Sequence, residues 1–214
     1  MNEIIKKTEE FVRNVHKNEA TGHDWYHIER VWKNALLIQK KEGAGDLFVI
    51  EMAALLHDIP DEKLNASEEA GWRKLNEYIT SLGIPDSVVS HIVDCIESVS
   101  FKGGRAIDLK TIEAKIVQDA DRLDALGAIG VARTFAFGGK KEQPLYDPEI
   151  AVRVQMTNEE YRSGKSSSIH HFYEKLLKLK DLMNTDAARQ IAEQRHEFME
   201  DFLKQFNREW NGQA

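Results

Sequence analysis

Three short stretches of the sequence carry histidine or aspartate among apolar residues. They are "DWYHIERV" with His27, "AALLHDI" with the doublet His57-Asp58, and "DADRLDALG" with Asp121. Imidazole nitrogens and carboxylate oxygens together suit a divalent transition metal. Four such ligands would leave about two positions of an octahedron open for water or substrate oxygens. Because a bound divalent ion lowers the pKa of water and polarises a phosphoryl oxygen, this set predicts metal-assisted hydrolysis.

His27 lies on the apolar face of a predicted helix. At helical spacing it shares that face with Val31, Ala35 and Ile38, so its side chain should point inward. Taken alone, a core histidine satisfied by one hydrogen bond would explain this position more simply.

The doublet follows an almost entirely apolar run. Pro60 disfavours helical geometry at Ile59, so the helix should end close to Asp58. At a helix end both side chains can turn toward one ion. His57 alone would suit a helix C-terminus, where it could bond the last carbonyls, but a carboxylate is disfavoured there. Asp58 therefore predicts a positive charge nearby.

Asp121 lies in a stripe of small and apolar residues that includes Val117 and Ala128. An unpaired buried carboxylate is costly, so Asp121 needs a cation or a proton. The adjacent Arg122 projects about 100° away along a helix and is a poor partner. A metal ion and a buried ion pair with a distant arginine both remain open.

In this order and with these flanks, the three segments resemble the HD-domain superfamily of metal-dependent phosphohydrolases, most of all its small bacterial branch of the YpgQ/YedJ type. The resemblance covers about residues 20–135. It implies an all-α helical bundle around a buried metal site, with His27, His57, Asp58 and Asp121 as ligands. It also implies cleavage of phosphate esters or anhydrides, mostly of nucleotides. Release of pyrophosphate from nucleoside triphosphates is among the activities of this branch.

Many HD hydrolases place a further acid three residues after the aspartate of the doublet, where it orients or deprotonates water. Here that residue is Asp61, with Glu62 beside it. The second-messenger hydrolases with a similar pair have Glu and then Asp, so which of the two acids handles the proton stays open. Glu62 could equally begin an exposed turn.

Candidate substrate contacts are basic residues and histidines around these motifs. A phosphate would suit a positive charge or a hydrogen-bond donor at these positions. His23, next to a helix start, could be an ordinary surface residue. His91, on an inward helix face, could be a core residue. The lysines could be simply solvated. The candidates are His23, Lys63, His91, Lys102 and Arg122.

Helical periodicity dominates the sequence, and glycines mark the gaps. We expect one all-α domain over residues 1–214, with the C-terminal helices completing the bundle. The helices are predicted at 2–17, 24–42, 46–58, 66–82, 86–99, 109–137 with a break left open, 148–160, 168–182 and 185–209.

Composition narrows the class of protein. The 214 residues carry a net charge of −7, which argues against a nucleic-acid partner, and no apolar run approaches the roughly 20 residues of a membrane span. The single cysteine, Cys95, excludes an internal disulfide and fits a cytoplasmic protein. The N-terminal stretch is charged at helical spacing, unlike a signal peptide. The last predicted helix could pack on the bundle or pair two protomers as a homodimer.

The sequence therefore predicts a metal-dependent phosphohydrolase acting on a small phosphorylated substrate, with a nucleotide as the expected class. Mn²⁺ is the expected ion, and Fe, Co, Ni, Zn or Mg are alternatives. Two other functions stay open. One is a non-catalytic regulatory module that binds a nucleotide, against which the intact set of four ligands argues. The other is a purely structural metal site, which would lack open positions on the ion.

Overall fold

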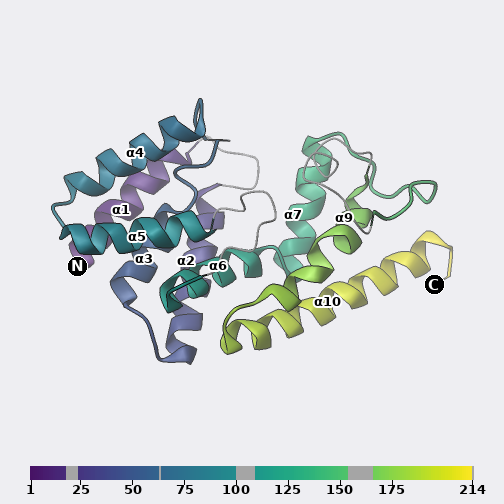
Figure 1. The fold of residues 1–214 in the computed structure, drawn as a ribbon. Coiled ribbons are helices and arrows are strands. Elements are labelled where there is room, and N and C mark those ends of the chain that lie inside the picture. The colour runs from purple at the N-terminus through teal and green to yellow at the C-terminus, as the bar shows by residue number, and fades with distance from the viewer. Residues whose placement is uncertain (18–23, 63, 100–108, 154–165, 214) are drawn as a thin grey trace. The chain divides into compact units, whose positions relative to one another are not determined.

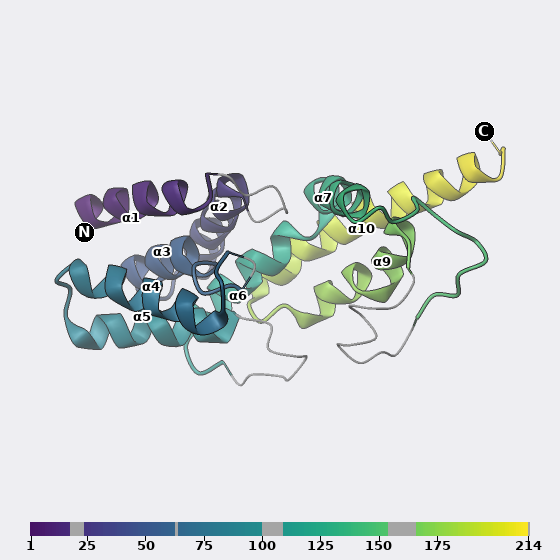
Figure 2. The same ribbon diagram turned by 90° about the horizontal axis from the view of Figure 1, so that it is seen from above.

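The structure is a computed structural model that describes residues 1–17, 24–62, 64–99, 109–153 and 166–213 (Figure 1, and from above in Figure 2). The described residues form helices and connecting turns without a strand, which confirms the predicted all-α class. Contacts within the chain gather in two compact units, Met1–Asp121 and Arg122–Ala214, where the sequence suggests one domain.

The described residues of the first unit form five helices and most of a sixth. Their bounds agree with the predicted ones to within two residues up to α5. They are α1 (Asn2–Val15), α2 (Trp25–Glu42), α3 (Leu47–Leu56), α4 (Glu68–Ser81), α5 (Asp86–Val99) and α6 (Ile112–Asp124), which belongs to this unit as far as Asp121.

Helix α3 is the core of the first unit. It packs against α1, α2 and α5, and its residues from Met52 to Leu56 are fully buried. A helix that is apolar on every side is stable only when other elements surround it, which explains this central position. Asp46 caps its start by accepting hydrogen bonds from the N–H groups of Phe48 and Val49. The Glu113 side chain in turn accepts the Asp46 N–H, at 2.8 Å.

The predicted helix 109–137 is two helices. Helix α6 ends at Asp124, and α7 (Gly127–Lys140) begins after a turn in which Gly127 has a φ of +71°. A side chain at Gly127 would also come within 3.0 Å of Arg195. Glycine therefore serves both the left-handed backbone and the close approach of α10.

The second unit continues with α9 (Ser168–Glu174), the 3-10 helix η1 (Leu176–Leu182) and α10 (Asp186–Trp210). One predicted helix, 168–182, is thus broken at Lys175, where φ is −135°. Helix α10 packs on α7 and η1, and α9 packs on α7 and η1.

The helix predicted at 148–160 is wrong for residues 148–153, which are turn and irregular backbone. The remaining residues of that range lie outside the described ones. Asp147 accepts the N–H of Glu149 in a local turn, at 3.0 Å, which competes with helix formation. Arg153 then pairs with Glu174, at 2.7 Å, and ties this segment to α9.

Within the described part of the chain, no helix has the length and apolar character needed to cross a membrane.

The central position of α3 predicts very different costs for two leucines of the same helix. Leu55→Ala should lower the free energy of unfolding by about 2–5 kcal/mol, because Leu55 is fully buried. Leu47→Ala should change it by less than about 0.5 kcal/mol, because Leu47 is exposed. Urea unfolding followed by circular dichroism measures both. Equal losses would show that α3 is not the core helix.

Candidate metal centre

His27 is fixed by the start of α2. Asp24 caps this helix, and its carboxylate accepts the N–H of His27 at 2.9 Å. The His27 side chain is only 1% exposed, which confirms that it points inward as its helical spacing predicts.

His57 and Asp58 lie where α3 ends. The chain leaves the helix through tight turns, in which Ile59 N–H donates to Leu56 O and Asp61 N–H donates to Asp58 O, each at 3.0 Å. His57 Nδ1 lies 2.9 Å from the carbonyl of Ala54. Because a carbonyl only accepts, Nδ1 is the donor of this bond, and Nε2 is the ring nitrogen that faces the neighbouring carboxylates. Nε2 is buried and has no hydrogen-bond partner among the described residues.

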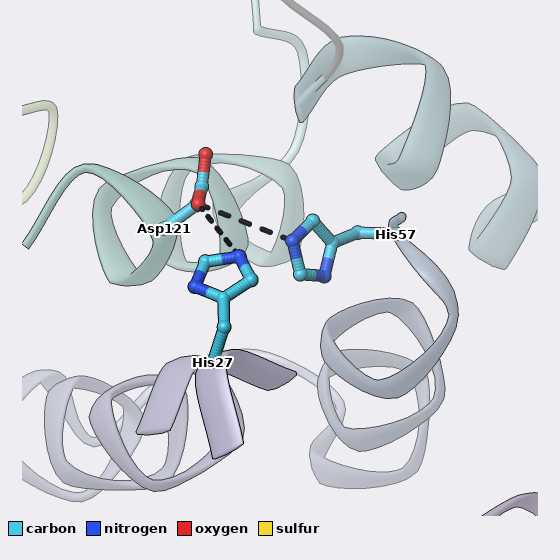
Figure 3. A group of neighbouring side chains, drawn as sticks. All are labelled: His27, His57 and Asp121. Carbon is cyan, nitrogen blue, oxygen red and sulfur yellow. Dashed lines mark ion pairs between the residues drawn. The ribbon is translucent and has the colours of Figure 1, made fainter. Parts of the chain in front are cut away.

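Four side chains from three segments meet in this unit, and Figure 3 shows three of them pointing toward one another. His27 Nε2 lies 3.5 Å from Asp58 Oδ2 and 3.6 Å from Asp121 Oδ1. His57 Nε2 lies 3.4 Å from Asp58 Oδ1 and 3.9 Å from Asp121 Oδ1. The two imidazole rings meet edge to face, with centroids 5.5 Å apart.

This arrangement fits a divalent transition metal. One ligand atom from each of His27, His57 and Asp121 lies within 4.8 Å of the others. Neighbouring ligands at bond lengths of about 2.1 Å in an octahedron would be about 3 Å apart, slightly less than the separations here. The lone pair of His57 Nε2 and two carboxylates in one place give the ion neutral nitrogen and anionic oxygen donors.

The predicted acids Asp61 and Glu62 follow directly after the doublet. Asp61 is half-buried and Glu62 is exposed. Asp61 is joined to Asp58 by the backbone hydrogen bond of the turn. Asn65, which was not predicted from the sequence, donates from its side-chain amide to the carbonyls of Ile59 and Asp61 in this turn.

The structure does not bring His91 to the cluster. His91 Nε2 lies 3.3 Å from Glu113 Oε2, and Glu113 contacts Asp46 at the start of α3. The start of α3 and His57 are at opposite ends of this helix, roughly 15 Å apart along its axis. Glu113 was itself missed from the sequence, where it is one acid in a charged stretch.

Of the other predicted substrate contacts, Arg122 lies in the described part of the chain. The Arg122 guanidinium donates to the carbonyl of Leu182 in the second unit. His23, Lys63 and Lys102 lie outside the described residues.

A buried ion pair, the alternative raised for Asp121, occurs one turn later in α6. Asp124 is 1% exposed and binds Arg133 with an oxygen–nitrogen distance of 2.6 Å. The lone cysteine does not compete as a nucleophile, because burial raises the pKa of the Cys95 thiol to about 12.

Comparison with known proteins identifies the family. The HD domain profile matches residues 24–126. The chain is also 39% identical to YpgQ of Bacillus subtilis over 204 residues, which cover 94% of this chain and 91% of that protein. This chain belongs to the HD family. An HD-superfamily hydrolase from Bacillus thuringiensis is 50% identical, with a TM-score of 0.79 over 98% of both chains. B. subtilis YpgQ in complex with ADP is 37% identical, with a TM-score of 0.78 over 98% of this HD protein and 100% of that chain.

Metal binding at this cluster should stabilise the folded state, because the unfolded chain does not hold the ligands together. At a hundredfold excess over the dissociation constant, Mn²⁺ or Co²⁺ should raise the free energy of unfolding by about 2.7 kcal/mol. Asp121→Ala should remove most of this gain. Asp94→Ala, at an exposed acid on α5, should keep it. Thermal unfolding of metal-stripped protein with and without the ion measures the difference, and an equal gain in both variants would place the ion elsewhere.

Proposed function

We propose that this HD protein is a metal-dependent phosphohydrolase that acts on nucleotides, with nucleoside triphosphates cleaved to release pyrophosphate as its specific reaction. One observation carries the proposal. Two imidazole nitrogens and two carboxylates, from the start of α2, the end of α3 and the last turn of α6, meet at 3.4–3.9 Å. The proposed ligands are His27, His57, Asp58 and Asp121.

Two relatives support the class of reaction and of substrate. The B. thuringiensis protein is described as an HD-superfamily hydrolase, and B. subtilis YpgQ has been crystallised with ADP. Both align with nearly the whole of this chain. A nucleotide with two or more phosphates is therefore the ligand class that we extend to this protein.

The proposed ligands differ in how far their side chains are exposed to solvent. His27, His57 and Asp58 are buried, whereas the side chain of Asp121 is 37% exposed. Substrate should therefore approach from the side of Asp121. A divalent ion held here would lower the pKa of water and stabilise charge on phosphoryl oxygens.

The remaining proton transfer falls to the acids after the doublet. Asp61 is half-buried, and its backbone N–H donates to the carbonyl of the proposed ligand Asp58, so a short turn ties the backbones of the two residues together. The side chain of Asp61 is the candidate base. We propose that it accepts a proton from the attacking water. Glu62 is exposed and less constrained.

Mn²⁺ is the proposed working ion. Two imidazoles make Mg²⁺ a less natural choice, and Fe, Co, Ni and Zn would accept the same donors.

A release assay tests the proposed reaction. Metal-stripped protein receives Mn²⁺, Co²⁺, Ni²⁺, Zn²⁺ or Mg²⁺ and is screened for phosphate and pyrophosphate release from nucleoside mono-, di- and triphosphates. We expect ion-dependent release of pyrophosphate from triphosphates, lost in Asp58→Ala. Release of phosphate alone would keep the hydrolase and reject the specific reaction. Binding of ion and nucleotide without turnover would instead show a regulatory binding module.

The assignment of the proton to Asp61 is tested by a pair of amide substitutions. Asp61→Asn should lower kcat by about 10²–10⁴, because the amide cannot accept the proton. Glu62→Gln should leave kcat close to that of the unaltered protein. Steady-state rates under saturating ion and substrate compare the two. The reverse order of effects would assign the proton to Glu62.

A further inference from the structure

We propose that Asn65 is a positioning residue of the candidate metal centre, which it serves by fixing the turn between Asp58 and Asp61. This inference rests on the proposed metal site. Asn65 touches neither the proposed ligands nor a substrate oxygen in this scheme, and it acts through backbone carbonyls of the turn.

The Asn65 side chain spans the turn with two hydrogen bonds. Its Nδ2 donates to the carbonyl of Ile59 and to the carbonyl of Asp61, each at 2.8 Å. These carbonyls lie on either side of Pro60. The first follows immediately after Asp58, and the second belongs to the proposed proton acceptor. One amide group thus holds the backbone next to both functional carboxylates.

Lys74 fixes the orientation of that amide. Its Nζ lies 2.5 Å from Asn65 Oδ1. An ammonium group only donates and the two carbonyls only accept, so the amide can satisfy all three partners in one orientation. Lys74 belongs to α4, which contributes no proposed ligand.

Gly71 provides a second, independent sign that α4 is fitted to this turn. A Cβ at Gly71 would lie 2.5 Å from the Pro60 carbonyl oxygen and 2.7 Å from Asn65 Nδ2. Only a residue without a side chain lets the helix approach the turn so closely. The turn is therefore held by hydrogen bonds from Asn65 and by backbone packing against α4.

The backbone of the turn needs such a partner. Carbonyl groups beyond a helix C-terminus have no intrahelical donor, and Pro60 has no N–H to offer. The carbonyls of Ala54, Leu56 and Asp58 are satisfied within the turn by His57 Nδ1, Ile59 N–H and Asp61 N–H. The Ile59 carbonyl instead receives the Asn65 amide. Without Asn65, the Ile59 carbonyl would lose its donor, and the backbone next to Asp58 would be held less firmly by the remaining turn hydrogen bonds and the packing against Gly71. The Asp58 carboxylate would then be less firmly directed toward the imidazoles.

Calorimetric titration with Co²⁺, together with the visible absorption spectrum of the bound ion, tests this role. Asn65→Ala should weaken Co²⁺ binding by roughly 10- to 100-fold and alter the spectrum, as losses of supporting groups around metal ligands do. Lys74→Met should shift the affinity in the same direction by less, because the amide remains. Asn76→Ala is the matched control, since Asn76 is exposed on α4.

The outcomes separate the positioning role from folding and from the hydrolase. Circular dichroism of metal-free Asn65→Ala should match the unaltered protein, and Lys74→Met carries the test if it does not. Unchanged Co²⁺ affinity and spectrum in both variants would overturn the proposal. Weakened binding in a protein that turns over no nucleotide would support the positioning role and reject the hydrolase. No Co²⁺ binding by the unaltered chain would overturn both.

Discussion

The first unit of this structure is organised around one electrostatic constraint. Asp58 and Asp121 both approach the same two imidazoles, and Asp58 is 8% exposed at the negative end of α3. Neither water nor the helix dipole can stabilise a carboxylate in that position. The proposed divalent cation would satisfy the constraint, because it would neutralise both acids and accept the imidazole lone pairs. The fold would then have to hold the four proposed ligands in place before the ion arrives.

The chain meets this demand through the ends of helices. Asp24 fixes the first turn of α2 and with it His27, and the exit from α3 sets His57 and Asp58. Helix α3 is itself anchored at its start by Asp46 and Glu113, and beyond its end by Asn65. A helix end is freer in backbone direction than a helix interior, so adjacent residues such as those of the doublet can face one point. Hydrogen bonds to capping groups have to limit this freedom of the backbone. The contacts described above at the ends of α2 and α3 do so.

Some of this organisation could be predicted from the sequence, and the part that could not has a physical reason. The ligand candidates interrupt apolar patterns, and the burial of His27 follows from its helical face alone. Glu113 acts on the backbone of another segment, and Asn65 acts on an irregular turn just before it in the chain. Neither contact follows a helical or strand repeat, so periodicity in the sequence does not reveal them. His91 shows the limit of periodicity, which gives the face of a helix but not the level along its axis. It lies near Glu113 at the opposite end of α3 from the ligands.

Two aspartates of α6 show how the same residue type is used in two ways. Asp124 is buried and permanently neutralised by Arg133, at 2.6 Å. Asp121, three residues earlier, forms ion pairs only with His27 and His57 among the described residues. Imidazoles are charged only when protonated, and His57 Nδ1 donates to the Ala54 carbonyl, so Nε2 is the nitrogen that faces Asp121. An arginine beside Asp121 would have completed a structural ion pair and excluded a cation. Two imidazoles in its place can instead bind a divalent ion, and the proposed ion would balance the negative charge at a point where chemistry can occur.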